Sequence, residues 1–269
     1  MRPRRTARPV SPLSGADRML LIVPSSEGKR SPQQGAPLDL AALSFPELTE
    51  PRRTLLAALI ATSASPDASA RLGIPASRTT LLVQQQTLNE RPTAAAHEIY
   101  TGVLHRALDY GSLGPAERER AARVLCFSSP LYGLLRPEDA IAPYRLTATA
   151  RLLGGVSPVT RWSAHLPAVL HSALGERGLI VDLRAASHRA LGTLIAPAVQ
   201  VATIACAPGT SGGNVALKQL RGAVARYLLR ASEEAEDLPM LIDQLSTRWR
   251  VAVLPALSVE KPVTLLLAP

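Results

Sequence analysis

Three prolines and one glycine fix the path of one stretch of this sequence, Phe127 to Leu146 (FSSPLYGLLRPEDAIAPYRL). Proline holds φ near about −65° and keeps the residue before it out of the helical region, whereas Gly133 can adopt a positive φ. A stretch punctuated in this way is stiff, and it presents Arg136 and Arg145 at defined places. The rest of the chain has to be arranged around it.

Two interpretations of these arginines are open from the residues alone. A guanidinium fork on a rigid loop suits a phosphate or a carboxylate. Alternatively, both are internal ties that pair with Glu138, Asp139 and backbone carbonyls, which is the commoner role. Because the residues from Tyr144 to Ala150 predict a strand, we expect Arg145 to be more structural than Arg136.

Short apolar runs predict buried strands, because a strand covered on both faces needs no polar alternation. These runs are Leu20 to Val23, Val124 to Phe127, Leu179 to Leu183, Val199 to Ala205, Val251 to Leu254 and Val263 to Leu267.

Helices are predicted between these strands from apolar periodicity and from helix-start residues. The predicted helices are a segment from Thr49 through Ile60, Ala94 to Leu108, Pro115 to Ala122, Thr160 to Leu174 with a kink or a late start at Pro167, Asn214 to Ala231, and one that ends near Trp249. The order lacks the regular repeat of a barrel or a doubly wound fold. We therefore predict the α+β class, as a single mixed α/β domain with a mixed sheet and surrounding helices.

The charge and the hydropathy narrow the class of partner. Residues 1 to 18 are rich in Arg and Pro and predict a disordered tail, so the domain is expected to span residues 19 to 269. The net charge is +9, and the tail supplies four of these charges through its arginines. This excess permits binding to a polyanion without proving it. No run approaches the ~18 to 20 apolar residues of a membrane span, so we expect a cytoplasmic monomer with no membrane partner.

The sequence lacks the motifs of a metal site, a serine hydrolase, a dithiol redox site and a dinucleotide-binding site. The five histidines lack the spacing of metal ligands, and no G-x-S-x-G, Cys-x-x-Cys or dinucleotide-binding pattern is present. We therefore expect no metal and no cofactor. Two local patterns fit phosphate contacts: the turn with Lys29 and Arg30 after the first strand, and the row of Lys218, Arg221 and Arg226 on one helix. The commoner explanation of such a row is a solvated basic face.

A further turn, Arg71 to Pro75 (RLGIP), resembles the Leu-Gly-Ile turn of helix-hairpin-helix DNA-binding proteins, in which backbone amides meet a phosphate. A tetrapeptide of this kind is frequent by chance, so an ordinary turn is the commoner explanation.

Five segments, taken in order, resemble the peroxide stress protein YaaA family. LYGLLRPEDAIAPYRL, at the end of the central stretch, is similar to the family's (L/W)(Y/W)GxLRPxDxIxxYRL signature. The other four segments are MLLIVPSSEGKR (Met19 to Arg30), IYTGVL (Ile99 to Leu104), LIVDLRAASH (Leu179 to His188) and LKQLRGAVARYLL (Leu217 to Leu229). Each one alone is a weak match, but their shared order makes the resemblance specific.

The resemblance implies a cytosolic protein of the peroxide response that binds double-stranded DNA through a basic cleft and helps to limit damage from unincorporated iron. The cations of the matching segments are then the expected phosphate contacts, namely Lys29, Arg30, Arg136, Arg145, Lys218, Arg221 and Arg226. The chain departs from the family at Ala223, where an arginine is usual, and at Ala186 and His188, where serine and tyrosine are frequent.

A second hypothesis belongs to a different class. The same cluster of arginines and lysines could serve an enzyme that acts on a phosphorylated or carboxylated small molecule, with Glu27 or Asp139 as the acid or base. Salt-dependent binding to unrelated duplexes favours the first hypothesis. Stabilisation by a small metabolite without affinity for DNA favours the second.

Overall fold

The main sheet mixes a parallel centre with antiparallel edges. The computed structural model describes residues 18–175, 177–193, 198–256 and 261–268. The predicted tail, apart from Arg18, lies outside these residues. The sheet order is β4 (Gly133–Leu135), β3 (Leu125–Ser129), β1 (Met19–Pro24), β6 (Gly178–Asp182), β7 (Val199–Cys206), β9 (Val263–Ala268) and β8 (Arg250–Leu254).

Strand β1 lies in the middle of the parallel part and pairs with β3 on one side and β6 on the other. Its residues from Met19 to Val23 are almost completely buried, as their continuous apolar character predicts. The outer strands β4 and β8 are antiparallel to their neighbours. A mixed sheet with helices around it confirms the predicted α+β class.

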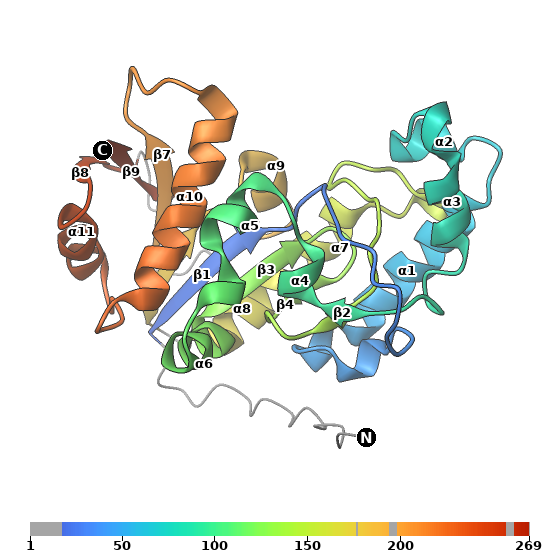
Figure 1. Ribbon diagram of the computed structural model, residues 1–269, viewed down its shortest axis with the longest axis horizontal. Helices are drawn as coiled ribbons and strands as arrows, with labels where there is room; N and C mark the ends of the chain where they lie inside the picture. The colour runs from blue at the N-terminus through green and yellow to red at the C-terminus, as the bar shows by residue number, and fades with distance from the viewer. Residues whose placement is uncertain (1–17, 176, 194–197, 257–260, 269) are drawn as a thin grey trace.

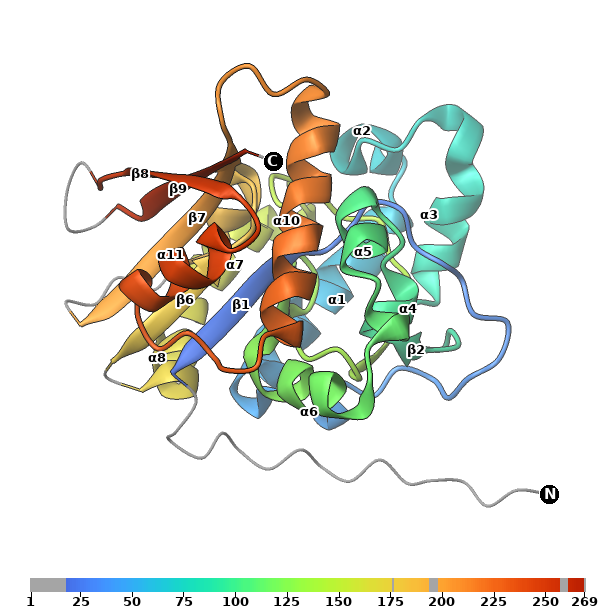
Figure 2. The same ribbon diagram turned by 60° about the vertical axis from the view of Figure 1, so that its left-hand side comes forward.

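Helices cover the sheet and form a separate group beyond one end of it (Figures 1 and 2). The helices are α1 (Thr49–Ser63), α2 (Ala68–Leu72), α3 (Thr79–Gln86), α4 (Ala96–Ile99), α5 (Val103–Leu108), α6 (Pro115–Val124), α7 (Pro158–Ser163), α8 (Leu166–Leu174), α9 (Ala186–Arg189), α10 (Gly213–Arg230) and α11 (Leu238–Ser246). Both views place α5 beside α10 over one face of the sheet, and Figure 1 shows α1 to α3 together at the end away from β8. None of the helices within the described residues is long and apolar enough to cross a membrane.

The contact between α5 and α10 requires a glycine. A Cβ atom added to Gly222 of α10 would lie 2.2 Å from the carbonyl oxygen of Leu104 and 2.7 Å from the Cβ of Ala107, both in α5. The two helix backbones therefore approach as closely as they do because position 222 has no side chain.

The prediction of a strand from Tyr144 to Ala150 was wrong. These residues form no strand and join no ladder. The backbone N–H of Arg145 donates instead to the side-chain oxygen of Gln85 in α3. Because a side chain satisfies this donor, the segment needs no neighbouring strand.

Two predicted helices are broken. The segment from Ala94 to Leu108 begins with strand β2 (Ala94–Ala95), which pairs with β5 (Ala140–Ile141) in a second sheet, and it is interrupted again between α4 and α5. The segment from Thr160 to Leu174 is divided into α7 and α8. Pro167 lies in the first turn of α8, so the late start is the alternative that the structure confirms.

Candidate functional site

Five parallel strands, β1, β3, β6, β7 and β9, end at the same edge of the sheet. After β1 the chain forms β3 on one side of that strand, and later it forms β6 on the other side. Ligands of open parallel sheets bind outside the carboxyl ends, at the point where the direction of winding changes. The turn after β1 carries Lys29 and lies at this point.

Backbone contacts fix the turn after β1. Lys29 forms an isolated antiparallel bridge with Tyr100. The N–H of Arg30 donates to the carbonyl of Ile99 at 2.9 Å, and the N–H of Thr101 donates to the carbonyl of Gly28 at 3.1 Å. These bonds explain why the predicted helix is interrupted between α4 and α5, since its residues pair with the turn instead.

The amine of Lys29 lies between aromatic rings. Its Nζ is 4.2 Å from the centre of the Tyr144 ring and 5.6 Å from that of Tyr100. It donates a hydrogen bond of 2.5 Å to the carbonyl oxygen of Ser26. Burial of the amine, together with the nearby charge of Arg145, lowers the pKa of Lys29 to about 7. A large neutral fraction of this amine is therefore present at neutral pH.

Hydroxyl groups lie next to the amine. The Oγ of Ser129, at the end of β3, accepts hydrogen bonds from the N–H groups of Leu131 at 3.2 Å and Tyr132 at 2.9 Å, and it lies 2.7 Å from the Oη of Tyr144. Because both lone pairs of Ser129 are occupied, its proton points to Tyr144. The Tyr144 proton is then available to another acceptor. The buried Oη of Tyr100 makes no well-aligned hydrogen bond among the described residues, and burial together with the neighbouring Tyr144 hydroxyl raises the pKa of Tyr100.

Two histidines near the amine are neutral at pH 7. The Nε2 of His188, in α9, is 3.5 Å from the Oγ of Ser25, and the Nε2 of His105 donates to the carbonyl of Pro24 at 2.9 Å. Burial lowers the pKa of each histidine to about 4, and the charge of Lys29 contributes to both shifts.

An ion pair is buried beneath this site. Arg184 donates to the two carboxylate oxygens of Asp182 at 2.9 and 2.8 Å and to the carbonyl of Gly192 at 2.9 Å. Both side chains of the pair are buried almost completely. Their charges compensate each other, so the pair fixes the end of β6 and adds no net charge to the site.

Three of the predicted phosphate-binding cations gather around one exposed carboxylate, that of Glu27. The guanidinium of Arg145 lies 3.0 Å from the Glu27 carboxylate. The hydrogen bond from Arg145 lowers the pKa of Glu27, and the charges of Lys218 and Lys29 lower it further. Lys218 is exposed in the N-terminal half of α10. One carboxylate thus pairs with Arg145 and lies within the electrostatic influence of Lys218 and Lys29.

Arg136 lies elsewhere, and the expected order of Arg136 and Arg145 was wrong. Arg136 is only 5% exposed, whereas the side chain of Arg145 is 26% exposed. Arg136 donates to the carbonyl of Leu125 at 3.1 Å and packs over the ring of Phe45. The interpretation as an internal tie is therefore correct for Arg136, whereas Arg145 pairs with an exposed acid.

Asp139, the other residue predicted as an acid or base, is bound to a loop and not to the cations near Glu27. Its carboxylate accepts from the backbone N–H and hydroxyl of Ser44 and from the backbone N–H of Arg136. These bonds hold a loop, and they occupy both carboxylate oxygens.

The remaining predicted cations are dispersed. Arg30 is exposed and pairs with Glu98 at 3.2 Å. Arg221 is 9% exposed, and its Nε donates to the carbonyl of Ile204 in β7 at 3.0 Å. Arg226 donates to the carbonyls of Leu108 and Asp109, at the C-terminal end of α5.

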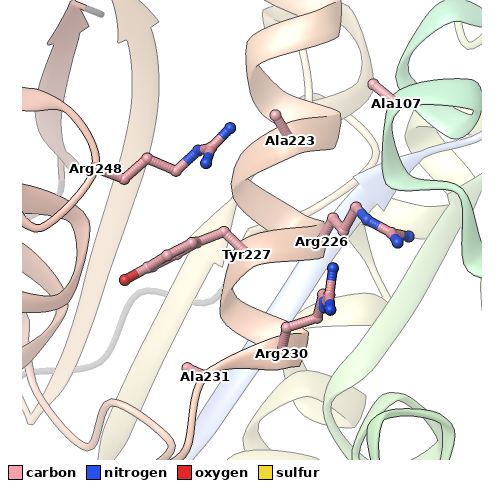
Figure 3. A pocket seen from close by; sticks show the side chains of 7 residues that line it. All are labelled: Ala107, Ala223, Arg226, Tyr227, Arg230, Ala231 and Arg248. Carbon is pink, nitrogen blue, oxygen red and sulfur yellow. The ribbon is translucent and has the colours of Figure 1, made fainter. Parts of the chain in front are cut away.

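Arg226 also lines a hollow with a cavity volume of about 570 Å³. Figure 3 shows Tyr227 and Arg248 on one side of α10 and Arg226 and Arg230 on the other. Two of the three arginines have acidic partners, because Arg226 lies 3.5 Å from Asp109 and Arg230 lies 2.9 Å from Glu117.

Sequence reasoning did not single out the tyrosines, Ser129 or His188. A signal was present, because Tyr100, Tyr144 and His188 all lie in segments that resemble one family. The fold brings these segments together at the carboxyl edge of the sheet. Within the described residues, no group of three His, Cys, Asp or Glu side chains is placed to hold a metal ion.

These features define a mixed α/β protein with a lysine and tyrosine site at the carboxyl edge of its parallel strands. The sequence profile of the family described as Peroxide stress protein YaaA matches residues 19–245. The chain belongs to this peroxide stress protein family.

Three bacterial relatives are similar to this chain over most of their length. A UPF0246 protein of Streptomyces coelicolor is 34% identical over 233 residues, which cover 84% of this chain and 89% of the relative. One from Corynebacterium efficiens is 34% identical over 221 residues, covering 81% and 87%. One from Salinispora tropica is 32% identical over 253 residues, covering 89% and 90%.

Proposed function

We propose that this member of the peroxide stress family is a cytosolic monomer that binds double-stranded DNA through its phosphates and thereby limits damage from peroxide and unincorporated iron. The observation that carries the proposal is the gathering of Lys29, Arg145 and Lys218 around the single carboxylate of Glu27. A phosphate oxygen could replace that exposed carboxylate with little loss of solvation.

A helical turn on the same side of the molecule supports the proposal. Helix α2 ends at Gly73, which has a φ of 60° and an open space where a Cβ would lie, and α3 follows after a short turn that contains Arg78. Figures 1 and 2 show α2 and the beginning of α10 both at the upper side of the molecule. A duplex could thus contact both.

The test is a salt series with unrelated duplexes. Four glutamines replace Arg2, Arg4, Arg5 and Arg8 in the full chain, so that the tail cannot account for binding. We expect an affinity that depends little on sequence, with a log-log slope of about −0.9 per phosphate neutralised.

The variants Lys218→Ala and Arg145→Ala should each make the slope shallower by about one unit. Arg177→Ala is the matched control, because Arg177 is exposed just before β6, at the opposite edge of the sheet. No retention of duplex at low salt, or equal losses in all three variants, would reject DNA binding at this edge.

The second candidate function is an enzyme that acts on a phosphorylated or carboxylated small molecule. The observation that favours it is the half-buried amine of Lys29 between Tyr100 and Tyr144, because contact with a DNA backbone does not require such a group. Saturable thermal stabilisation by phosphate esters or carboxylates, without retention of duplex, would support this function over the first.

A further inference from the structure

We propose that Lys29 is a nucleophile that forms an imine with an aldehyde adjacent to a phosphate, such as the open-chain form of a sugar phosphate. The binding part of this inference rests on the phosphate contacts proposed above for Arg145 and Lys218, but the covalent step does not depend on DNA. Free sugar phosphates and an abasic site in duplex DNA present the same chemistry.

The position of the amine is the first argument. The backbone of Lys29 is fixed by its bridge to Tyr100, and the amine is fixed by its bond to the carbonyl of Ser26 and by the ring of Tyr144. An amine held at a defined point is a better nucleophile than one on a mobile surface side chain, because less freedom is lost on reaction.

The state of the amine is the second argument. Lysine attacks carbonyl carbon only in its neutral form, and burial beside another cation is a recognised way to provide that form. Arg145 is the neighbouring cation, and burial together with its charge lowers the pKa of Lys29 to about 7. The carboxylate of Glu27 opposes the shift but lies in a hydrogen bond with Arg145.

The hydroxyl groups are the third argument. The Tyr144 proton is not used by Ser129, and the hydroxyls of Tyr100 and Ser25 lie close enough to Tyr144 to influence its pKa. These hydroxyl groups are placed to serve the oxygen of a bound carbonyl compound.

The chemical step balances with these groups. The Nζ lone pair of Lys29 attacks the aldehyde carbon, and the carbonyl π electrons move to oxygen, which takes a proton from Tyr144. The amine then loses a proton, which restores the tyrosine. Tyr144 then protonates the carbinolamine hydroxyl, which leaves as water while the nitrogen lone pair forms the C=N bond. The resulting iminium returns its N–H proton to the tyrosinate to give the imine, and hydrolysis reverses the same steps. No oxidant, reductant or metal is consumed.

The position of the cations defines the substrate class. Arg145 and Lys218 lie around Glu27, in the same turn as Lys29. A phosphate held by these cations would place an aldehyde a few bonds away next to Nζ. An aldehyde without a phosphate lacks this anchor and should react more slowly.

The experiment traps the imine in the full-length protein. Sodium cyanoborohydride reduces an imine to a stable secondary amine, and peptide mass spectrometry then locates the adduct. The chain contains three lysines, Lys29, Lys218 and Lys261, so the assignment is unambiguous. One arm uses 2-deoxyribose 5-phosphate, the second a duplex with one abasic site, and the third glyceraldehyde as an aldehyde without phosphate.

We expect the adduct on Lys29 in at least one phosphate arm, formed at least tenfold faster than with glyceraldehyde. Lys29→Arg should lower the yield at least tenfold, and Lys261→Arg is the matched lysine control with an unchanged yield. Tyr144→Phe should slow adduct formation without loss of ligand binding, which a purely structural role would not produce. Unchanged melting temperatures would show that the variants fold.

The outcomes separate this inference from the proposed function. An adduct on Lys29 from the sugar phosphate, together with failure to retain duplex, would overturn DNA binding and leave this inference standing. Retention of duplex without an adduct on Lys29 in any arm would overturn this inference alone. Equal labelling of all three lysines and the chain terminus would also overturn it.

Discussion

The Nζ of Lys29 lies 4.2 Å from the centre of the Tyr144 ring, although the two residues belong to separate segments of the chain. Lys29 follows the central strand β1, and Tyr144 lies in the stiff stretch after β3. This contact joins a cation with a lowered pKa to a tyrosine with an available proton.

The first prediction concerns pH and the burial of Lys29. Its pKa is about 7 in the folded chain and 10.5 when unperturbed. Below pH 7 the amine is charged in both states, and the folded chain bears the full cost of burial. Between pH 7 and pH 10.5, Lys29 binds more protons in the unfolded chain than in the folded chain. The free energy of unfolding therefore rises with pH across this interval. Lys29→Met should therefore stabilise the protein more at pH 6 than at pH 9, as measured by urea denaturation.

The groups that face Lys29 do not titrate in this interval. His105 and His188 have pKa values of about 4, and burial raises the pKa of Tyr100 and Tyr144 above 10. Lys261→Met, at an exposed position, is the control and should give the same small change at both pH values. An equal gain for Lys29→Met at pH 6 and pH 9 would contradict a lowered pKa.

The second prediction compares Arg136 with Arg145. Arg136→Ala removes a buried guanidinium that donates to the carbonyl of Leu125, so we expect a loss of about 3 kcal/mol in the free energy of unfolding. Arg145→Ala breaks a partly exposed ion pair with Glu27, so the loss should be under about 1 kcal/mol. Denaturant midpoints measure both. A larger loss for Arg145 would reverse this order.

The third prediction concerns Arg52, a fully buried residue of α1. Its guanidinium donates to the carbonyls of Tyr132 and Leu134 near β4 and to those of Ser44 and Phe45 before α1. Arg52→Met should lower the free energy of unfolding by about 3 kcal/mol or more, because several buried acceptors lose their donor together. Thermal or denaturant unfolding provides the measurement.

The neighbouring Arg53 is a matched control for Arg52. It is exposed and pairs with Glu50 on the helix surface. Arg53→Met should change the free energy of unfolding by less than about 0.5 kcal/mol. Similar losses in the two variants would mean that the carbonyl contacts of Arg52 contribute little.

The fourth prediction concerns Gly222 in α10. Replacing glycine by alanine in a helix usually stabilises it by about 1 kcal/mol. Gly222→Ala should instead destabilise the protein by about 2 kcal/mol, because the new methyl group meets the carbonyl oxygen of Leu104. Gln219→Ala, on the exposed side of the same helix, should have almost no effect on the melting temperature. A stabilised Gly222→Ala variant would show that α5 can move away freely.

Local sequence predicted the strands of the sheet more accurately than the connecting segments. Runs such as Leu20 to Val23 are apolar at every position, so burial on both faces is the only low-energy outcome. The segment from Ala94 to Leu108 has helical periodicity, yet the middle of it pairs with the turn at Lys29. That pairing partner is distant in sequence, and local periodicity contains no information about it.

The sequence by itself determined the α+β class, the buried strands, the late start of α8 at Pro167, and the presence of cations in the segments that resemble the family. Only the tertiary structure decided which of these cations are buried as internal ties and which face an exposed partner. Arg136 and Arg145 occupy the same stiff stretch, but one is enclosed beneath β3 and the other faces Glu27. The physical reason is that burial and pKa depend on atoms contributed by distant segments. For Lys29 these are the rings of Tyr100 and Tyr144, whose positions only the folded chain defines.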